Sequence, residues 1–389
     1  MMLTQRKAMA IDWDKVLEID SHIYSSFDPE ARKKHFWKTL EEVFKSRPNL
    51  DKDISPCDFL FVKSMRRADY DWLFESIAQE CLRSKRLLDI YRIYTGKLRP
   101  YPLLLVLKYF PLFFSMLSHG FHKAVYLFVK AVGYLEVLER VGKFYPHQNL
   151  VVFADMQPID NLLVQAARLR NQKTVTLQHG LYVDYSEKPN INVVNYKNMV
   201  SEYFLAWGAA TGELINNYHS GAKVVLCGKP MKEPALQDEQ GDYFTVLFDQ
   251  NAFRSYNAEM LRIAYDLAKK TKLKVNVRFH PRNNPASYRV RQDSTYTGLS
   301  WEGSRFILAH TTSMIHEIMR FGVPVFKYDT EIPCADVPCE LKFKSVDDLR
   351  GLVAGIRNAE FDFEEVAGRY ICSVGDESLF RYRDFFSRV

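Results

Sequence analysis

Three hydroxyl side chains follow a histidine in the second half of the chain, in the run His310-Thr311-Thr312-Ser313. The largely apolar run 305–309 before these residues is typical of a buried parallel strand, and a short helix is expected after them. At a helix start, unpaired backbone N–H groups and the helix dipole favour an anion such as phosphate. Glu317 lies one helical turn after Ser313, on the same face, where a carboxylate suits sugar hydroxyls. The run therefore predicts a nucleotide-shaped site, although plain helix capping explains the hydroxyl residues equally well.

A second charged group follows another strand-like segment earlier in the chain. Residues 273–279 alternate between apolar and polar types, and the strand should end at His280 because Pro281 cannot extend a sheet ladder. Ligands of open α/β sheets bind at the edge formed by the carboxyl ends of the strands. Arg278 and Arg282 would meet phosphate oxygens there through bidentate hydrogen bonds, beside His280. A purely structural histidine is the alternative for His280.

More polar side chains are expected at the same edge. Gln250 and Asn251 follow Asp249 at the end of the strand predicted over residues 243–248, and they should face the cleft. Lys229 comes directly after Gly228, where it would neutralise a phosphate near a hinge. A plain surface lysine is an equally good interpretation of Lys229.

Two candidates for a general base lie in the first half of the chain. Asp155 ends the buried strand predicted at 149–154, although it could simply cap the helix that begins near Pro158. His179 ends the next predicted strand, and Gly180 beside it would let a ligand approach the backbone closely. A positioned base of this kind accelerates proton transfer by about 10²–10⁴.

Composition narrows the class of protein. The chain has 389 residues, a net charge of +6 and 47% apolar residues. That length suits two domains, and the mild positive charge suits anionic ligands without arguing for nucleic acid. The six cysteines have no metal-ligand spacing. We therefore expect free thiols in a reducing compartment and no metal site.

The order of strand and helix patterns predicts an α/β fold with two Rossmann-like, doubly wound domains. We place a helical extension at 1–50, a first α/β domain at 51–230, a second at 231–370 and a C-terminal helix at 371–389. Within the first domain, the aromatic runs 101–114 and 121–138 are read as two inserted helices. Lys108 and Pro111 interrupt the first run, which falls short of the roughly 20 apolar residues of a membrane span. Core helices are the favoured interpretation, with membrane-surface contact as the alternative.

Several short motifs together resemble the GT-B glycosyltransferases that build bacterial surface polysaccharides such as capsule, lipopolysaccharide and teichoic acid. His-Pro followed by a hydroxyl pair is also similar to the cytidine-monophosphate site of bacterial sialyltransferases, with related pieces in Kdo transferases and polyol-phosphate transferases. The resemblance covers residues 145–330. It rests on these motifs: Gln178-His179-Gly180, Cys227-Gly228-Lys229-Pro230, His280-Pro281, Thr311-Thr312-Ser313 and residues 317–324.

The resemblance implies a transferase that moves a sugar from a CMP- or UDP-linked donor to a growing polysaccharide or a lipid-linked acceptor. The donor would lie on the second domain, with His280 helping the phosphate to leave, and the acceptor would enter from the first. Catalysis would be inverting, with Asp155 or His179 as the base, and would need no cofactor or metal. The expected location is cytoplasmic, with peripheral attachment to the cytoplasmic face of the inner membrane as the alternative.

Three other functions fit the same sequence features. One is a phosphotransferase that uses a CDP-linked polyol, and another is a sugar-nucleotide epimerase, which would need more carboxylates in the cleft. The third is a binding protein that kept the fold and lost the chemistry.

Overall fold

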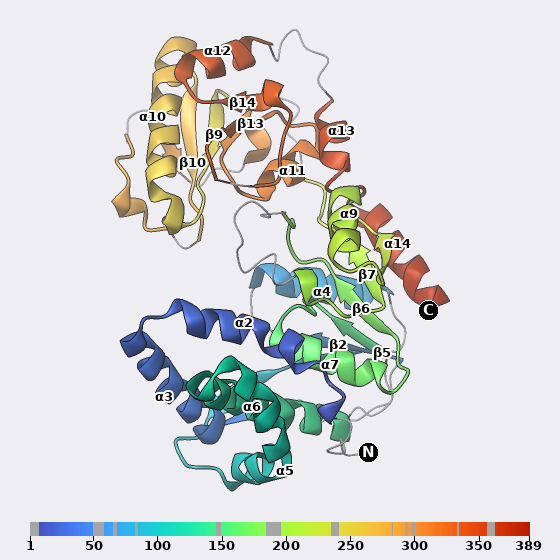
Figure 1. The fold of residues 1–389 in the computed structure, drawn as a ribbon. Coiled ribbons are helices and arrows are strands. Elements are labelled where there is room, and N and C mark those ends of the chain that lie inside the picture. Colours follow the sequence, from blue (N-terminus) through green and yellow to red (C-terminus); the bar gives the residue numbers. More distant parts are fainter. Residues whose placement is uncertain are drawn as a thin grey trace.

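The computed structural model describes residues 8–49, 58–64, 68–81, 85–144, 149–183, 196–234, 241–281, 283–291, 295–297, 301–332, 334–355 and 362–389. These residues form two lobes, each built around a six-stranded parallel sheet (Figure 1). The fold class predicted from the sequence is confirmed.

The second lobe has the strand order of a Rossmann fold. Its strands run β11-β10-β9-β12-β13-β14, so that the order reverses between the adjacent strands β9 and β12. Helix α10 and the short helices α11 to α13 accompany this sheet. The strands are β9 (Tyr243–Leu247), β10 (Lys274–Arg278), β11 (Thr295–Thr297), β12 (Ile307–Ala309), β13 (Val325–Tyr328) and β14 (Lys342–Phe343). The helices are α10 (Arg254–Thr271), α11 (Met314–Met319), α12 (Val346–Gly355) and α13 (Phe363–Gly368).

The first lobe uses the order β3-β2-β5-β6-β7-β8, which reverses between β2 and β5. The strands are β2 (Phe59–Lys63), β3 (Lys85–Asp89), β5 (Asn149–Val152), β6 (Thr174–Leu177), β7 (Tyr203–Ala206) and β8 (Lys223–Leu226). The helices that follow them are α4 (Ala68–Cys81), α7 (Pro158–Arg168) and α9 (Ala209–Tyr218).

A layer of helices covers one side of the first lobe (Figure 1). It contains the two aromatic segments, and the second of them, α6, is buried along most of its length. The expected helical character of residues 1–50 is wrong at its end, because Ser46–Asn49 forms β1 and pairs antiparallel with β4. The elements are α2 (Trp13–Ser26), α3 (Pro29–Lys45), β4 (Tyr91–Tyr94), α5 (Pro100–Met116), the 3-10 turn η1 (Leu117–His119) and α6 (Phe121–Phe144).

The C-terminal helix α14 (Gly375–Arg388) crosses back from the second lobe and packs on α4 of the first (Figure 1). Phe385 and Phe386 join the apolar core beneath the first sheet. The connecting segment passes so close to the first lobe that side chains would collide. A Cβ on Gly208 would lie 2.5 Å from the Arg369 carbonyl oxygen, and one on Gly228 only 2.2 Å from that of Ser373. These glycines are therefore required by chain crossing.

Candidate functional site

The carboxyl edges of the two sheets face each other. Lys229 follows β8 of the first lobe, and Glu317 lies in α11, just after β12 of the second. Lys229 Nζ is 2.7 Å from Glu317 Oε1, and both side chains are mostly shielded from solvent. The Lys229 ammonium also lies 4.7 Å from the ring centroid of Trp207. This ion pair joins the lobes at the edges where ligands of such sheets bind.

At the switch between β9 and β12, a buried carboxylate organises the loop that carries the hydroxyl run. Asp249 Oδ2 accepts hydrogen bonds from the backbone N–H of Thr311 (2.9 Å) and from its hydroxyl (2.8 Å). His310 Nδ1 lies 3.0 Å from the same oxygen, and its Nε2 lies 2.6 Å from the hydroxyl of Thr330. His310 is fully buried. Both ring nitrogens of His310 and the Thr311 hydroxyl thus bind other protein groups. In this conformation these two residues hold the loop in place, whereas the sequence predicted that they would offer these atoms to a nucleotide-sugar.

Other polar side chains at this edge remain accessible. Thr312, Ser313 and His280 are partly exposed, and Gln250, Asn251 and Arg278 are exposed. They follow β12, β10 and β9, which are neighbours in the sheet. Arg278 makes no ion pair with any residue that the structure describes, so its charge is available to an anion. Arg282 lies outside the described residues.

Helix α11 differs from the expected phosphate-binding helix in two ways. It has only six residues, Met314–Met319, so few peptide dipoles align. Ser313 makes no side-chain cap bond there, and its hydroxyl instead donates to Glu317 Oε1 at 3.3 Å. The oxygen of Glu317 that was expected to meet a ribose therefore already binds Lys229 and Ser313.

At the corresponding edge of the first lobe, the aspartate that follows the strand has no exposed surface. Asp155 is fully buried, and its Oδ2 accepts from the backbone N–H groups of Val200 and Ser201, both at 2.8 Å. Its other oxygen is buried without a hydrogen-bond partner among the described residues. In this conformation Asp155 fixes the backbone segment before β7. Its role as a base stays a prediction, and it requires a movement that exposes the carboxylate to the acceptor.

A second buried carboxyl was missed by the sequence reasoning. Asp160, in the first turn of α7, accepts a hydrogen bond from the N–H of Ala154, and burial raises its pKa to about 7. The charge of Asp155 adds to that rise, whereas the Ser64 hydroxyl and the Ala154 amide oppose it. The sequence shows Asp160 as an ordinary N-terminal helix residue, so only its burial marks it.

His179 is the candidate base that reaches the surface. It is partly exposed, and its Nδ1 lies 3.1 Å from the carbonyl oxygen of Phe153 and 3.0 Å from the hydroxyl of Tyr182. The carbonyl only accepts and the hydroxyl can accept as well, so these contacts favour the neutral tautomer with the proton on Nδ1 and the basic lone pair on Nε2. The buried Gln178 positions this loop, since its side chain binds the N–H of Trp207 and the carbonyl of Gly180.

A cavity of about 740 Å³ lies away from these edges, among α2, the end of α5, α6 and the segment around Asn198. Its link to the first sheet is Asn161, which donates to the carbonyl oxygens of both Asn198 and Asp155. The carboxyl edges of the two sheets are the better candidate site, because the accessible side chains of Arg278, Gln250 and Asn251 lie there. Among the described residues, no group of three or more His, Cys, Asp or Glu side chains could hold a metal ion.

Two solved structures share this arrangement of two lobes. The calicheamicin glycosyltransferase CalG4 aligns over 85% of this chain and 98% of its own, with a TM-score of 0.50 and 13% identity. A UDP-N-acetylglucosamine 2-epimerase from Rickettsia bellii aligns over 85% of this chain and 95% of its own, with the same TM-score and identity. No protein-family model matches the chain, and no curated protein sequence matches it. At this identity the likeness establishes a GT-B-like fold, and the activity has to be argued from the site.

Proposed function

We propose that the protein is a glycosyltransferase that binds a nucleotide-activated sugar on the second lobe and transfers the sugar to an acceptor held by the first. The observation that carries this proposal is the set of accessible polar side chains at the β9–β12 switch, which includes the Arg278 cation, without an ion-pair partner among the described residues. Such a switch is where ligands of doubly wound sheets bind. The similar structures include both a glycosyltransferase and a UDP-sugar epimerase, which is consistent with a nucleotide-sugar ligand.

In the proposed reaction, Arg278 and His280 balance the charge that develops on the leaving phosphate, and Thr312 donates a hydrogen bond to it. Gln250 and Asn251 contact the remainder of the donor. Protein cations fixed in place before the reaction stabilise such charge without having to reorganise. From the first lobe, Nε2 of His179 accepts the proton of the attacking acceptor hydroxyl. The attack inverts the anomeric carbon.

The finer assignment is a CMP- or UDP-linked donor and a surface polysaccharide or lipid-linked acceptor. It rests on the resemblance of the His280-Pro281 and Thr312-Ser313 motifs to those of surface-polysaccharide transferases. A CDP-polyol phosphotransferase and a binding protein remain alternatives, and the reaction products separate them from a transferase.

The first experiment measures binding and products with the full chain. Thermal shift with CMP, CDP, UDP, GDP and dTDP identifies the nucleotide, and a ligand at 100 times its Kd stabilises the folded state by about 2.7 kcal/mol. Arg278→Gln should abolish that shift. Arg262→Gln is the matched control, because Arg262 is an exposed arginine on α10 of the same lobe, paired with Glu259. A nucleotide shift that survives Arg278→Gln would move the donor site elsewhere.

Chromatography of the reaction mixture then distinguishes the functions. Transfer of a sugar without phosphorus supports the proposal, and transfer of a polyol phosphate with release of CMP supports the phosphotransferase. An epimerised sugar that stays on its nucleotide indicates an epimerase, and binding without turnover indicates a binding protein. His179→Gln should lower turnover by about 10²–10⁴ with little change in the KM for the donor. Full turnover in that variant would exclude His179 as the base.

A further inference from the structure

Helix α5 is apolar on two opposite faces. The inner face packs into the domain core, and its residues are at most 3% exposed. The outer face recurs with the helical period of three to four residues and is open to solvent, with Leu107 75% exposed. The inner residues are Leu105, Tyr109, Leu112 and Met116. The outer face consists of Leu103, Leu107, Phe110, Phe114 and Leu117, and Phe121 at the start of α6 continues it.

This outer face concentrates the exposed apolar surface of the protein. Of the fifteen large hydrophobic side chains that are exposed among the described residues, six belong to this face, and a seventh, Leu104, lies beside it on α5. Scattered exposed leucines are ordinary, but a continuous stripe of this kind marks a surface that contacts something else. The stripe therefore needs a partner of apolar character.

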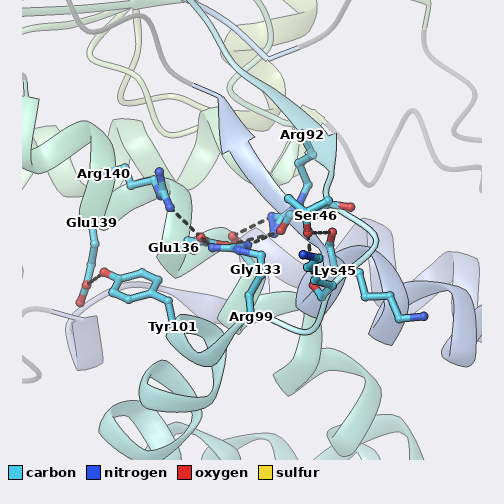
Figure 2. A network of polar contacts seen from close by, with 11 residues as sticks. Lys45, Ser46, Arg92, Arg99, Tyr101, Gly133, Glu136, Glu139 and Arg140 are labelled. Carbon is cyan, nitrogen blue, oxygen red and sulfur yellow. Dashed lines mark hydrogen bonds and ion pairs between the residues drawn. The ribbon is translucent and has the colours of Figure 1, made fainter.

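Polar contacts on the inner side hold α5 flat against α6. The hydroxyls of Tyr101 and Tyr109 each donate to Glu139 at 2.6 Å, and the Lys108 ammonium pairs with the same carboxylate. The neighbouring Glu136 of α6 is fully buried and binds Arg92, Arg99 and Arg140 (Figure 2). Because Arg99 immediately precedes α5, this network fixes the start of the helix as well.

Length and composition alone would let Pro100–His119 span a membrane, the single such segment among the described residues. Spanning would require α5 to leave α6 and would strand the buried carboxylate of Glu139. A helix that stays on α6 can instead lie parallel to a membrane surface, with its outer face inserted among the lipid chains. Pro111 and the non-helical Tyr109 kink the helix near its middle.

The charge around the stripe favours an anionic surface. Between Asp89 and Glu136 the chain contains six Lys or Arg residues and no Asp or Glu, and four of the six pair with acidic side chains of the helical layer, Asp20, Glu136 and Glu139. Lys97 is exposed just before α5, and the partly exposed Lys123 follows Phe121. Cations at both ends of an apolar helix face attract anionic headgroups, each with an interaction that falls off within a Debye length.

We propose that the outer face of α5 docks the protein on the surface of a bilayer that contains anionic lipid, with α5 lying in the plane of the headgroups. The inference is independent of the transferred group, because it uses no residue of the proposed active site. It provides the first lobe with a direct approach to lipid-linked molecules.

Vesicle flotation tests the proposal with the full chain. The protein should float with vesicles that contain phosphatidylglycerol, bind phosphatidylcholine vesicles more weakly, and lose part of its binding at high salt. The double variant Leu107→Glu/Phe114→Glu should reduce flotation by more than about tenfold, because two carboxylates would enter the apolar layer. Phe380→Glu is the matched control, since Phe380 is 63% exposed on α14, outside the stripe, and that variant should float like the wild type.

Two results would overturn the proposal. One is a wild-type protein that does not float with phosphatidylglycerol vesicles, and the other is a double variant that floats as well as the wild type. Gel filtration over a range of concentrations checks the competing occupant: a wild-type dimer that the double variant abolishes, without vesicle binding, would assign the stripe to a second copy of the chain. Circular dichroism of the variant verifies that the fold is retained.

Discussion

The two sheets place a buried aspartate at comparable positions but use it differently. Asp249 follows β9 and binds three donors through one oxygen, including the ring of His310. Asp155 follows β5 and binds two backbone N–H groups, while its second oxygen lacks a partner among the described residues. The edge of the second lobe is thus a firmly bonded loop that presents Thr312 and Ser313. At the edge of the first lobe, Asp155 is fully buried, and a second fully buried carboxyl, Asp160, lies nearby. A residue type at a strand end therefore does not reveal whether it binds a ligand or the protein itself.

Replacing each of the two aspartates should give the largest difference in stability between the two lobes. Asp249→Ala leaves three donors without their acceptor, so the free energy of unfolding should fall by about 3–5 kcal/mol, and nucleotide binding should be lost with the loop. Asp155→Ala removes an acceptor from only two N–H groups and should cost less. Urea denaturation measures both, and equal losses would refute the contrast.

The pH dependence of stability should expose Asp160. Its pKa is about 7 when folded and 3.8 ordinarily, so the folded state holds an extra proton between these values. The free energy of unfolding should then decrease as pH rises from about 4 to 7, by roughly 4 kcal/mol from this group. Asp160→Asn, which cannot ionise, should flatten that part of the curve. If the variant keeps the wild-type slope, the carboxyl does not titrate as proposed.

In the second lobe a buried histidine should produce the opposite slope. His316 is fully buried in α11 and stacks on Tyr370 with ring centroids 3.8 Å apart. Burial lowers its pKa from 6.5 to about 4, so between these values the unfolded chain binds a proton that the folded protein does not. Stability should be lost as pH falls from about 6.5 to 4, by roughly 3 kcal/mol. His316→Phe should remove this acid-side loss, which is measured by urea denaturation at a series of pH values.

The ion pair that joins the two edges should have the smallest effect. Lys229→Met removes the partner of Glu317 but keeps the apolar stem against Trp207, so the loss should be about 1–2 kcal/mol, between that of an exposed pair and that of a buried one. Lys344→Met is the control, because Lys344 forms a more exposed pair with Asp329 in the second lobe. A cost for Lys229→Met no larger than that of the control would show that the link adds nothing to the folded state.

Much of the architecture could be predicted because strands and helices carry their own periodicity. The strands at 149–152 and 174–177, and the helix that begins at Pro158, lie where the sequence places them. The pairing of residues 46–49 with β4 was missed, because a short strand next to a helix has no periodicity of its own and is stabilised by its partner. The return of α14 to the first lobe was equally invisible, since its aromatic residues show that a face is buried but not against which lobe.

By itself, the sequence determined the fold class, the strand ends that carry polar residues and the apolar, acid-free character of residues 90–135. Each follows from local propensity, spacing or composition. Only the tertiary structure decided that His310 and Thr311 serve Asp249, that Lys229 meets Glu317, and that one face of α5 stays exposed while α6 is buried. The physical reason is that burial and pairing depend on which distant groups the folded chain brings into contact. A buried polar group has no water to bind, so its hydrogen-bond partners are the neighbours that the tertiary structure supplies.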